Sequence, residues 1–242
     1  MKEGNDTEQK RIWKKSLIFG FAALFLCGIG DWLIGYDPPG GQELIFGITS
    51  TKITEVPSWF YVTSMVFGVL SAFGCKAFAP VMSEIFDALG IKHESKAYKG
   101  FRFGMSSAPL MFISFHTACC IALLLIQAAL RAGVPEETAN SVFLIPTAVS
   151  IIPFTIWCFV VDIPVTVCFM ALVLKGKLGL PKWTIVCSPL GMSILMKIIG
   201  VVLIACGLGQ FAFLTTCGES WGYAFMCLAF LAVIRNNKGL IR

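Results

Sequence analysis

Charged residues are scarce in this chain. Asp, Glu, Lys and Arg together make up 14% of its 242 residues, whereas 57% are hydrophobic. A soluble globular domain contains roughly 25% charged residues, and the mean hydropathy of +0.80 also lies far on the apolar side. The connections between the apolar stretches are short, which excludes a separate soluble domain. The composition therefore indicates a single membrane domain.

The chain also lacks the spacings that mark metal and nucleotide sites. It has 10 cysteines and two histidines, but no Cys-x-x-Cys pair. No nucleotide-binding loop, fixed-period repeat or low-complexity tract is present. The sequence thus predicts neither a metal nor a cofactor. The net charge of +5 is spread over several connecting segments, which argues against nucleic acid as a partner.

Six apolar segments are long enough to cross a bilayer, since about 20 helical residues span a hydrocarbon layer of ~30 Å. We therefore predict an all-α transmembrane bundle with six spans in one domain, 1–242. Val81, Met82, Ile85 and Phe86 share one helical face, which predicts a further amphipathic helix over about 80–90 in the membrane interface. The predicted spans are residues 16–36, 58–79, 103–130, 142–174, 183–206 and 210–234.

Basic residues alternate along the chain. They are concentrated before the first span, between spans two and three, between spans four and five, and after span six. An excess of Lys and Arg marks cytoplasmic segments, so both termini are predicted to be cytoplasmic. The intervening external loop, 37–57, carries several apolar residues and is expected either to cover the outer mouth of the bundle or to pack in the interface.

The fourth predicted span contains three prolines, Pro146, Pro153 and Pro164. Each removes a helical hydrogen-bond donor. Either a kinked, tilted helix or a discontinuous helix lining a binding site accounts for them.

Five ionisable residues interrupt the apolar segments: Asp31, His116, Asp162, Lys197 and Glu219. Each costs at least ~2.5–3.5 kcal/mol when it lies at bilayer depth. We interpret them as a polar site inside the bundle. Lys197 is expected to pair with Asp162 or Glu219, and such an ion pair serves either helix register or function. The candidate catalytic residues are His116, Asp162, Lys197 and Glu219. The candidate ligand-binding residues are Asp31, His116, Asp162, Lys197, Glu219 and Tyr223.

Three functions are compatible with such a site. The first is a pocket for a small amphipathic or lipid-like molecule, with or without acid–base chemistry. The second is proton-coupled transport of a small solute; six spans without a visible repeat fit this less well unless the protein forms a homo-oligomer. Membrane lipids are the expected partners in either case.

The third function comes from a resemblance. Gly28-Ile29-Gly30-Asp31 resembles the Gly-x-Gly-Asp motif of intramembrane aspartyl proteases such as prepilin peptidases, which would make Asp162 the partner aspartate. In those families, however, the motif carries the second aspartate in chain order, whereas here it lies in the first span.

A broader resemblance involves three stretches. The segments 30–36 (Gly-Asp-Trp-Leu-Ile-Gly-Tyr), 181–183 (Pro-Lys-Trp) and 188–190 (Ser-Pro-Leu) are similar to those of a group of uncharacterised bacterial membrane proteins. The resemblance implies a six-helix fold in the bacterial cytoplasmic membrane, and it transfers no activity.

Overall fold

The computed structural model describes residues 2–36, 38, 51–237 and 240, which form nine helical elements and no strand. The long helices are α1 (Lys2–Gly35), α2 (Trp59–Ala88), α3 (Lys96–Arg131) and α4 (Glu136–Leu174). The remaining elements are η1 (Thr51–Glu55), η2 (Lys182–Cys187), α5 (Pro189–Ala205), η3 (Gly209–Thr215) and α6 (Gly218–Asn236).

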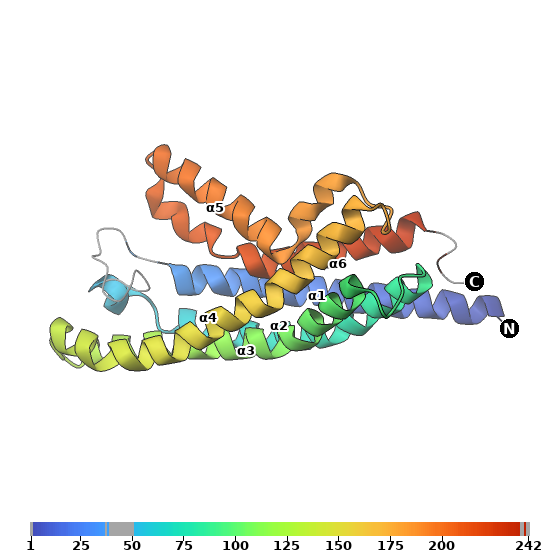
Figure 1. The fold of residues 1–242 in the computed structure, drawn as a ribbon. Coiled ribbons are helices and arrows are strands. Elements are labelled where there is room, and N and C mark those ends of the chain that lie inside the picture. Colours follow the sequence, from blue (N-terminus) through green and yellow to red (C-terminus); the bar gives the residue numbers. More distant parts are fainter. Residues whose placement is uncertain (1, 37, 39–50, 238–239, 241–242) are drawn as a thin grey trace.

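Helices α1, α2 and α3 run alongside one another, and α4 crosses them obliquely (Figure 1). Helix α6 packs along α1, and α3 packs against both α2 and α4. The α5–η3 hairpin leans away from this bundle and contacts mainly α6 (Figure 1). Helix α1 begins and helix α6 ends at the same end of the bundle.

The number of long apolar helices is smaller than predicted. Four helices are long and apolar enough to cross a membrane, and η3 with α6 makes a fifth if this pair, bent by 48°, is one span. Helix α5 has 17 residues, or about 26 Å at 1.5 Å per residue, which is less than the ~30 Å hydrocarbon layer. The all-helical, membrane-type architecture is therefore confirmed, but six straight spans are not present among the described residues.

Neither α2 nor α4 is broken at its prolines. Helix α2 continues through Pro80 to Ala88, so the expected separate helix over 80–90 is the end of α2. Its apolar face is buried in the core, where Met82 and Ile85 have no exposed surface. Helix α4 is likewise one continuous helix of 39 residues, which agrees with the first of the two alternatives for its prolines and not with the discontinuous helix.

Most of the predicted external loop lies outside the described residues. Its described end, η1, packs on α2 and α3, where Ile53 and Val56 are buried beside Tyr61. The side chain of Gln127 on α3 donates to the carbonyl oxygens of Ile53 and Val56, both at 2.7 Å. A buried amide thus satisfies the backbone of η1 and fixes it to the bundle.

Four of the largest buried side chains form an aromatic cluster that joins four helices. Phe86 of α2 lies 4.9 Å from Phe101 of α3 and 5.6 Å from Phe230 of α6, measured between ring centroids. Phe169 of α4 lies 6.1 Å from Phe230. Rings at these distances and tilts contribute beyond their buried area, so this cluster holds one end of the bundle together.

Glycines set the closest helix approaches. A Cβ atom added at Gly104 of α3 would lie 2.8 Å from the carbonyl oxygen of Val161 on α4. On α6, Cβ atoms added at Gly218 and Gly222 would each lie 2.6 Å from backbone atoms of α5, at Ser193 and Pro189. Both glycine pairs with a spacing of four are therefore packing positions, as small residues commonly are in membrane helices.

We predict that Gly104→Ala lowers the free energy of unfolding by about 1–3 kcal/mol, because α3 and α4 must separate to admit the methyl group. Thermal unfolding in detergent measures the change. Gly209→Ala is the control, since a Cβ atom there meets only Ile204, at 3.9 Å. Equal stability of the two variants would contradict the close approach.

Candidate functional site

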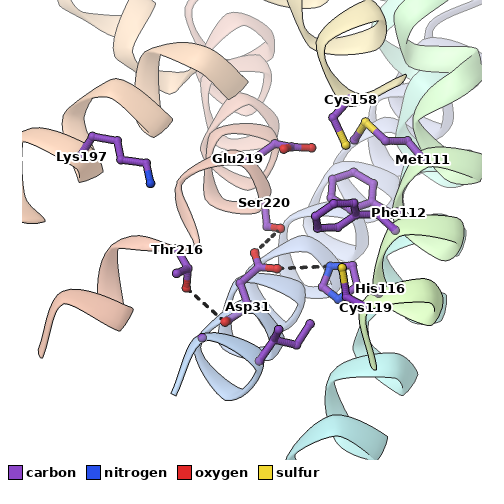
Figure 2. A pocket seen from close by; sticks show the side chains of 13 residues that line it. Asp31, Met111, Phe112, His116, Cys119, Cys158, Lys197, Thr216, Glu219 and Ser220 are labelled. Carbon is purple, nitrogen blue, oxygen red and sulfur yellow. Dashed lines mark hydrogen bonds and ion pairs between the residues drawn. The ribbon is translucent and has the colours of Figure 1, made fainter. Parts of the chain in front are cut away.

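A polar pocket of about 330 Å³ opens between α1, α3, α5 and α6 (Figure 2). Its ionisable lining comprises Asp31, His116, Lys197 and Glu219. These are four of the five ionisable residues that the sequence places within apolar segments. They come from four different helices, so only the folded bundle brings them together. We call this cavity the polar pocket.

A larger cavity of about 750 Å³ adjoins it between α4 and α5, and we call it the α4–α5 groove. It shares four lining residues with the polar pocket, and most of its remaining lining is apolar. Several of its walls are open to the outside: Phe159 is 55% exposed, Ile194 62% and Ile198 57%. The shared lining residues are Phe115, Cys158, Lys197 and Glu219.

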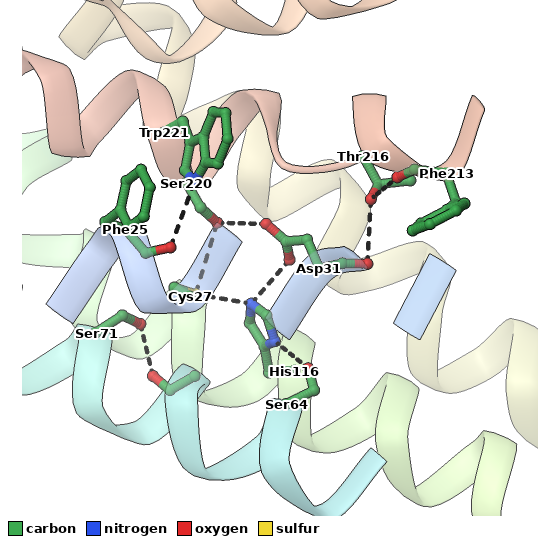
Figure 3. Close-up of polar contacts among 11 residues, drawn as sticks. Phe25, Cys27, Asp31, Ser64, Ser71, His116, Phe213, Thr216, Ser220 and Trp221 are labelled. Carbon is green, nitrogen blue, oxygen red and sulfur yellow. Dashed lines mark hydrogen bonds and ion pairs between the residues drawn. The ribbon is translucent and has the colours of Figure 1, made fainter. Parts of the chain in front are cut away.

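The centre of the polar pocket is a contact between a carboxyl group of α1 and an imidazole of α3. The Oδ1 atom of Asp31 lies 3.3 Å from Nε2 of His116 (Figure 3). The other carboxylate oxygen accepts a hydrogen bond of 2.6 Å from the hydroxyl of Ser220 on α6. His116 is 2% exposed. The Asp31 side chain is 14% exposed, so it is the more accessible member of the pair.

Two further side chains complete the surroundings of the imidazole. The Sγ atom of Cys27, one helical turn before Asp31, lies 3.1 Å from Nε2 of His116. The hydroxyl of Ser64 on α2 lies 3.3 Å from Nδ1. Both ring nitrogens therefore have polar neighbours, and the ring is fixed in orientation within an apolar bundle.

Small residues make room for this arrangement. A Cβ atom added at Gly68 of α2 would lie 2.5 Å from Cβ of His116. One added at Gly35 of α1 would lie 2.9 Å from Thr216, whose hydroxyl donates to the backbone oxygen of Asp31 at 3.1 Å. The glycines thus let α2 approach the histidine and let the start of α6 approach α1.

Asp162 belongs to a second polar group. It is 2% exposed, and one of its carboxylate oxygens accepts a hydrogen bond of 2.8 Å from the hydroxyl of the fully buried Tyr223. Glu219, one turn before Tyr223 on α6, lies next to Asp162 and lines both cavities. Glu219 therefore stands between the Asp162 group and the Asp31–His116 pair.

Lys197 does not form the ion pair that the sequence predicts. It is exposed, and within the described part of the chain no carboxylate oxygen lies within 4.0 Å of its ammonium group. It lines both cavities from α5, across the polar pocket from His116 (Figure 2). The prediction assumed that this ammonium group is buried, and the exposure of Lys197 on α5 is why it failed.

Sequence reasoning singled out Asp31 and His116 but did not pair them, and it passed over Ser220. The spacing of four residues between Cys27 and Asp31 places both on one helical face, and it is the one local feature of the sequence that brings two members of this site together. The aspartyl-protease hypothesis is not supported, because the two aspartates bind different partners: Asp31 contacts His116 and Ser220, whereas Asp162 contacts Tyr223.

Chemically, the two cavities combine an imidazole–carboxylate pair, two further carboxyl groups and a cation with an apolar surface. The polar end can bind hydroxyl, amide or phosphate groups, and His116 beside Asp31 can accept or donate a proton. The groove can hold hydrocarbon. Together they form a concave, largely apolar site with a few convergent polar groups.

The model of a family of unknown function, DUF6796, matches residues 1–237. The chain belongs to this family. No curated protein and no solved structure matched the chain. Membership is loosely consistent with the resemblance to uncharacterised proteins that the sequence suggested. The family has no known function, so the geometry of the site is what indicates a function for this DUF6796 member.

We predict that Asp31→Asn and His116→Asn are energetically coupled. A double-mutant cycle on the free energy of unfolding in detergent should give an interaction energy of about 0.5–3 kcal/mol, because the two groups contact each other. The cycle of Lys197→Ala with Asp162→Asn is the matched control and should give a value close to zero. Strong coupling in the control and none in the first pair would contradict the geometry described above.

Proposed function

We propose that this protein is an integral membrane protein that binds a lipid-like amphiphile, with the hydrocarbon part in the α4–α5 groove and the polar end in the polar pocket. The observation that carries the proposal is the continuity of the two cavities. Lys197 and Glu219 line both, at the junction between an apolar and a charged lining. A molecule that fills both cavities must itself be apolar at one end and polar at the other.

The exposure of the groove supports entry from the side. Val201 is 67% exposed and Val202 53%, and both line the groove together with Ile194 and Ile198. In a membrane, such surfaces meet acyl chains rather than water. A bilayer lipid can therefore reach the groove without leaving the hydrocarbon layer.

The charged side chains of the polar pocket favour a ligand whose polar end can both donate and accept hydrogen bonds. Asp31 and Glu219 accept, whereas Lys197 donates. A hydroxyl or amide headgroup satisfies both kinds of group, and an added phosphate would be placed against Lys197. Binding is the core of the proposal; a reaction at His116 is compatible with it.

The orientation in the membrane is part of the proposal. The N-terminal end of α1, the α2–α3 connection, the α4–α5 connection and the end of α6 all lie at one end of the bundle (Figure 1). These are the Lys- and Arg-rich segments, so the positive-inside rule places this end and both termini in the cytoplasm. Six crossings in a bacterial cytoplasmic membrane fit this arrangement, with α5 and η3 as the irregular part.

Proton-coupled transport is the second candidate, and one observation favours it. The 48° bend between η3 and α6 places a helix start, with Glu219 in its first turn, at the polar pocket. Broken helices of this kind form substrate sites in transporters. Uptake driven by a pH gradient in proteoliposomes, with no retained lipid, would favour transport over lipid binding.

Substitution in the groove tests the proposal. Ile198→Trp should reduce the amount of co-purified lipid several-fold, because the indole occupies space that the hydrocarbon needs. Mass spectrometry of lipids extracted after purification in mild detergent measures the loss. Wild-type protein should retain one headgroup class enriched over its abundance in the membrane.

Ile204→Trp is the matched control: Ile204 lies on the same helix and is 62% exposed, but it does not line the groove. The proposal fails if both variants retain the same lipids as wild type, or if the retained lipids mirror the bulk membrane.

A further inference from the structure

Three side chains of different chemistry converge beneath the polar pocket. Cys27 Sγ, Asp31 Oδ1 and His116 Nε2 all lie within 4.8 Å of one another. The sulfur is 3.1 Å from Nε2, and the carboxylate oxygen is 3.3 Å from the same nitrogen. We propose that these residues form a binding site for a transition-metal ion of the zinc class, with one coordination position open to the polar pocket.

The separations match those of ligands around one ion. Zinc bonds of about 2.0 Å to nitrogen or oxygen and 2.3 Å to sulfur, at tetrahedral angles, place neighbouring ligand atoms roughly 3.3–3.5 Å apart. The two observed contacts to Nε2 differ from that range by only a few tenths of an ångström. Little movement of the side chains is needed to admit the ion.

The arrangement differs from that of a nucleophilic triad. In a Cys–His–Asp triad, the thiol and the carboxylate contact opposite nitrogens of the imidazole. Here both face Nε2, and Nδ1 faces the hydroxyl of Ser64 (Figure 3). Convergence of three donor atoms on one point is the geometry of shared coordination.

A second set of contacts orients these three residues. Ser64 lies at the remaining ring nitrogen of His116, and Ser220 donates to the second carboxylate oxygen of Asp31 at 2.6 Å. The Ser220 hydroxyl also lies 3.6 Å from the sulfur of Cys27. Hydrogen bonds from outside the ligand set commonly fix the orientation of metal ligands in this way.

The donor set selects the class of metal. Thiolate and imidazole disfavour Mg²⁺ and Ca²⁺, which take oxygen ligands, and suit zinc and its first-row neighbours. Charge balance points the same way, because one thiolate and one carboxylate neutralise a divalent ion. An ion that leaves no net charge is well suited to a membrane interior, where an isolated charge is costly.

The open position follows from the cavity. Asp31 and His116 line the polar pocket, whereas Cys27 has no exposed surface, so the fourth side of the group faces the cavity. Three protein ligands and one open position are typical of catalytic rather than structural zinc. The idea that the ion contacts the polar end of an amphiphile rests on the proposed function. The metal site itself does not depend on that function.

Metal analysis of the purified full-length chain tests the site. Protein prepared without a histidine tag should contain about one zinc ion per chain, as a three-residue site predicts. Cys27→Ser, Asp31→Asn and His116→Asn should each reduce the zinc content on the order of tenfold or more. Cys227→Ser replaces an equally buried cysteine outside the cluster and should retain the zinc.

Cobalt titration of the wild-type protein keeps the proposal testable if the variants do not fold. Removal of zinc and addition of Co²⁺ should produce the absorption of a thiolate–cobalt bond, which zinc should then abolish. No zinc together with no such absorption overturns the site, and so does a Cys27→Ser chain that folds with a wild-type zinc content.

The metal experiment and the lipid experiment can fail separately. Loss of the metal site leaves the contrast between Ile198→Trp and Ile204→Trp unaffected, because neither residue belongs to the cluster. Failure of lipid retention leaves the zinc content unaffected for the same reason.

Discussion

The contact between the Asp31 carboxylate and the His116 imidazole joins α1 to α3 in the middle of an apolar bundle, and the site depends on it. Ser64 adds α2 through the other ring nitrogen, and Ser220 adds α6 through the other carboxylate oxygen. Four helices therefore meet at one polar point. The largely buried carboxylate and imidazole are stabilised only where all of their hydrogen-bond partners are present. Their contacts therefore also fix how the four helices are rotated relative to one another.

The remaining ionisable residues differ in how closely they contact other polar side chains. Asp162 is held by Tyr223 in the interior, whereas Lys197 extends from α5 with no carboxylate of the described residues within 4.0 Å of its ammonium group. Glu219 lies between these extremes, at the boundary of both cavities. A site that places an ammonium group and a carboxyl group at the edge of an apolar groove is suited to a ligand that brings its own polar group.

Composition and spacing predicted the coarse architecture well. Long apolar segments predicted membrane-type helices, and the four-residue glycine spacings at 100 and 104 and at 218 and 222 are typical of the close approaches that the packing contains. These features depend on local periodicity and side-chain size, which the sequence displays directly.

The predictions that failed concern contacts between residues that are far apart in the chain. Asp31 and His116 are 85 residues apart, and nothing local to either indicates the other. The burial of Met82 and Ile85 is decided by the helices they contact, since the same amphipathic pattern would suit a membrane interface equally well. The length of α5 is limited by the turns at its two ends, which apolar composition alone did not reveal.

The attachment of α5 has a consequence for selectivity. Close backbone contacts with α6 at Gly218 and Gly222 hold the first turns of the helix, at Ser193 and Pro189, and one face of its later part packs on η3, where Gly200 approaches Thr215. Farther along, its side chains form one wall of the groove and are open to the outside. The exposed side chains of this wall can change rotamer while the α1–α3 core keeps its packing. Thick and thin hydrocarbon chains would then be accepted alike, and discrimination would fall to the fixed chemistry at the bottom of the groove.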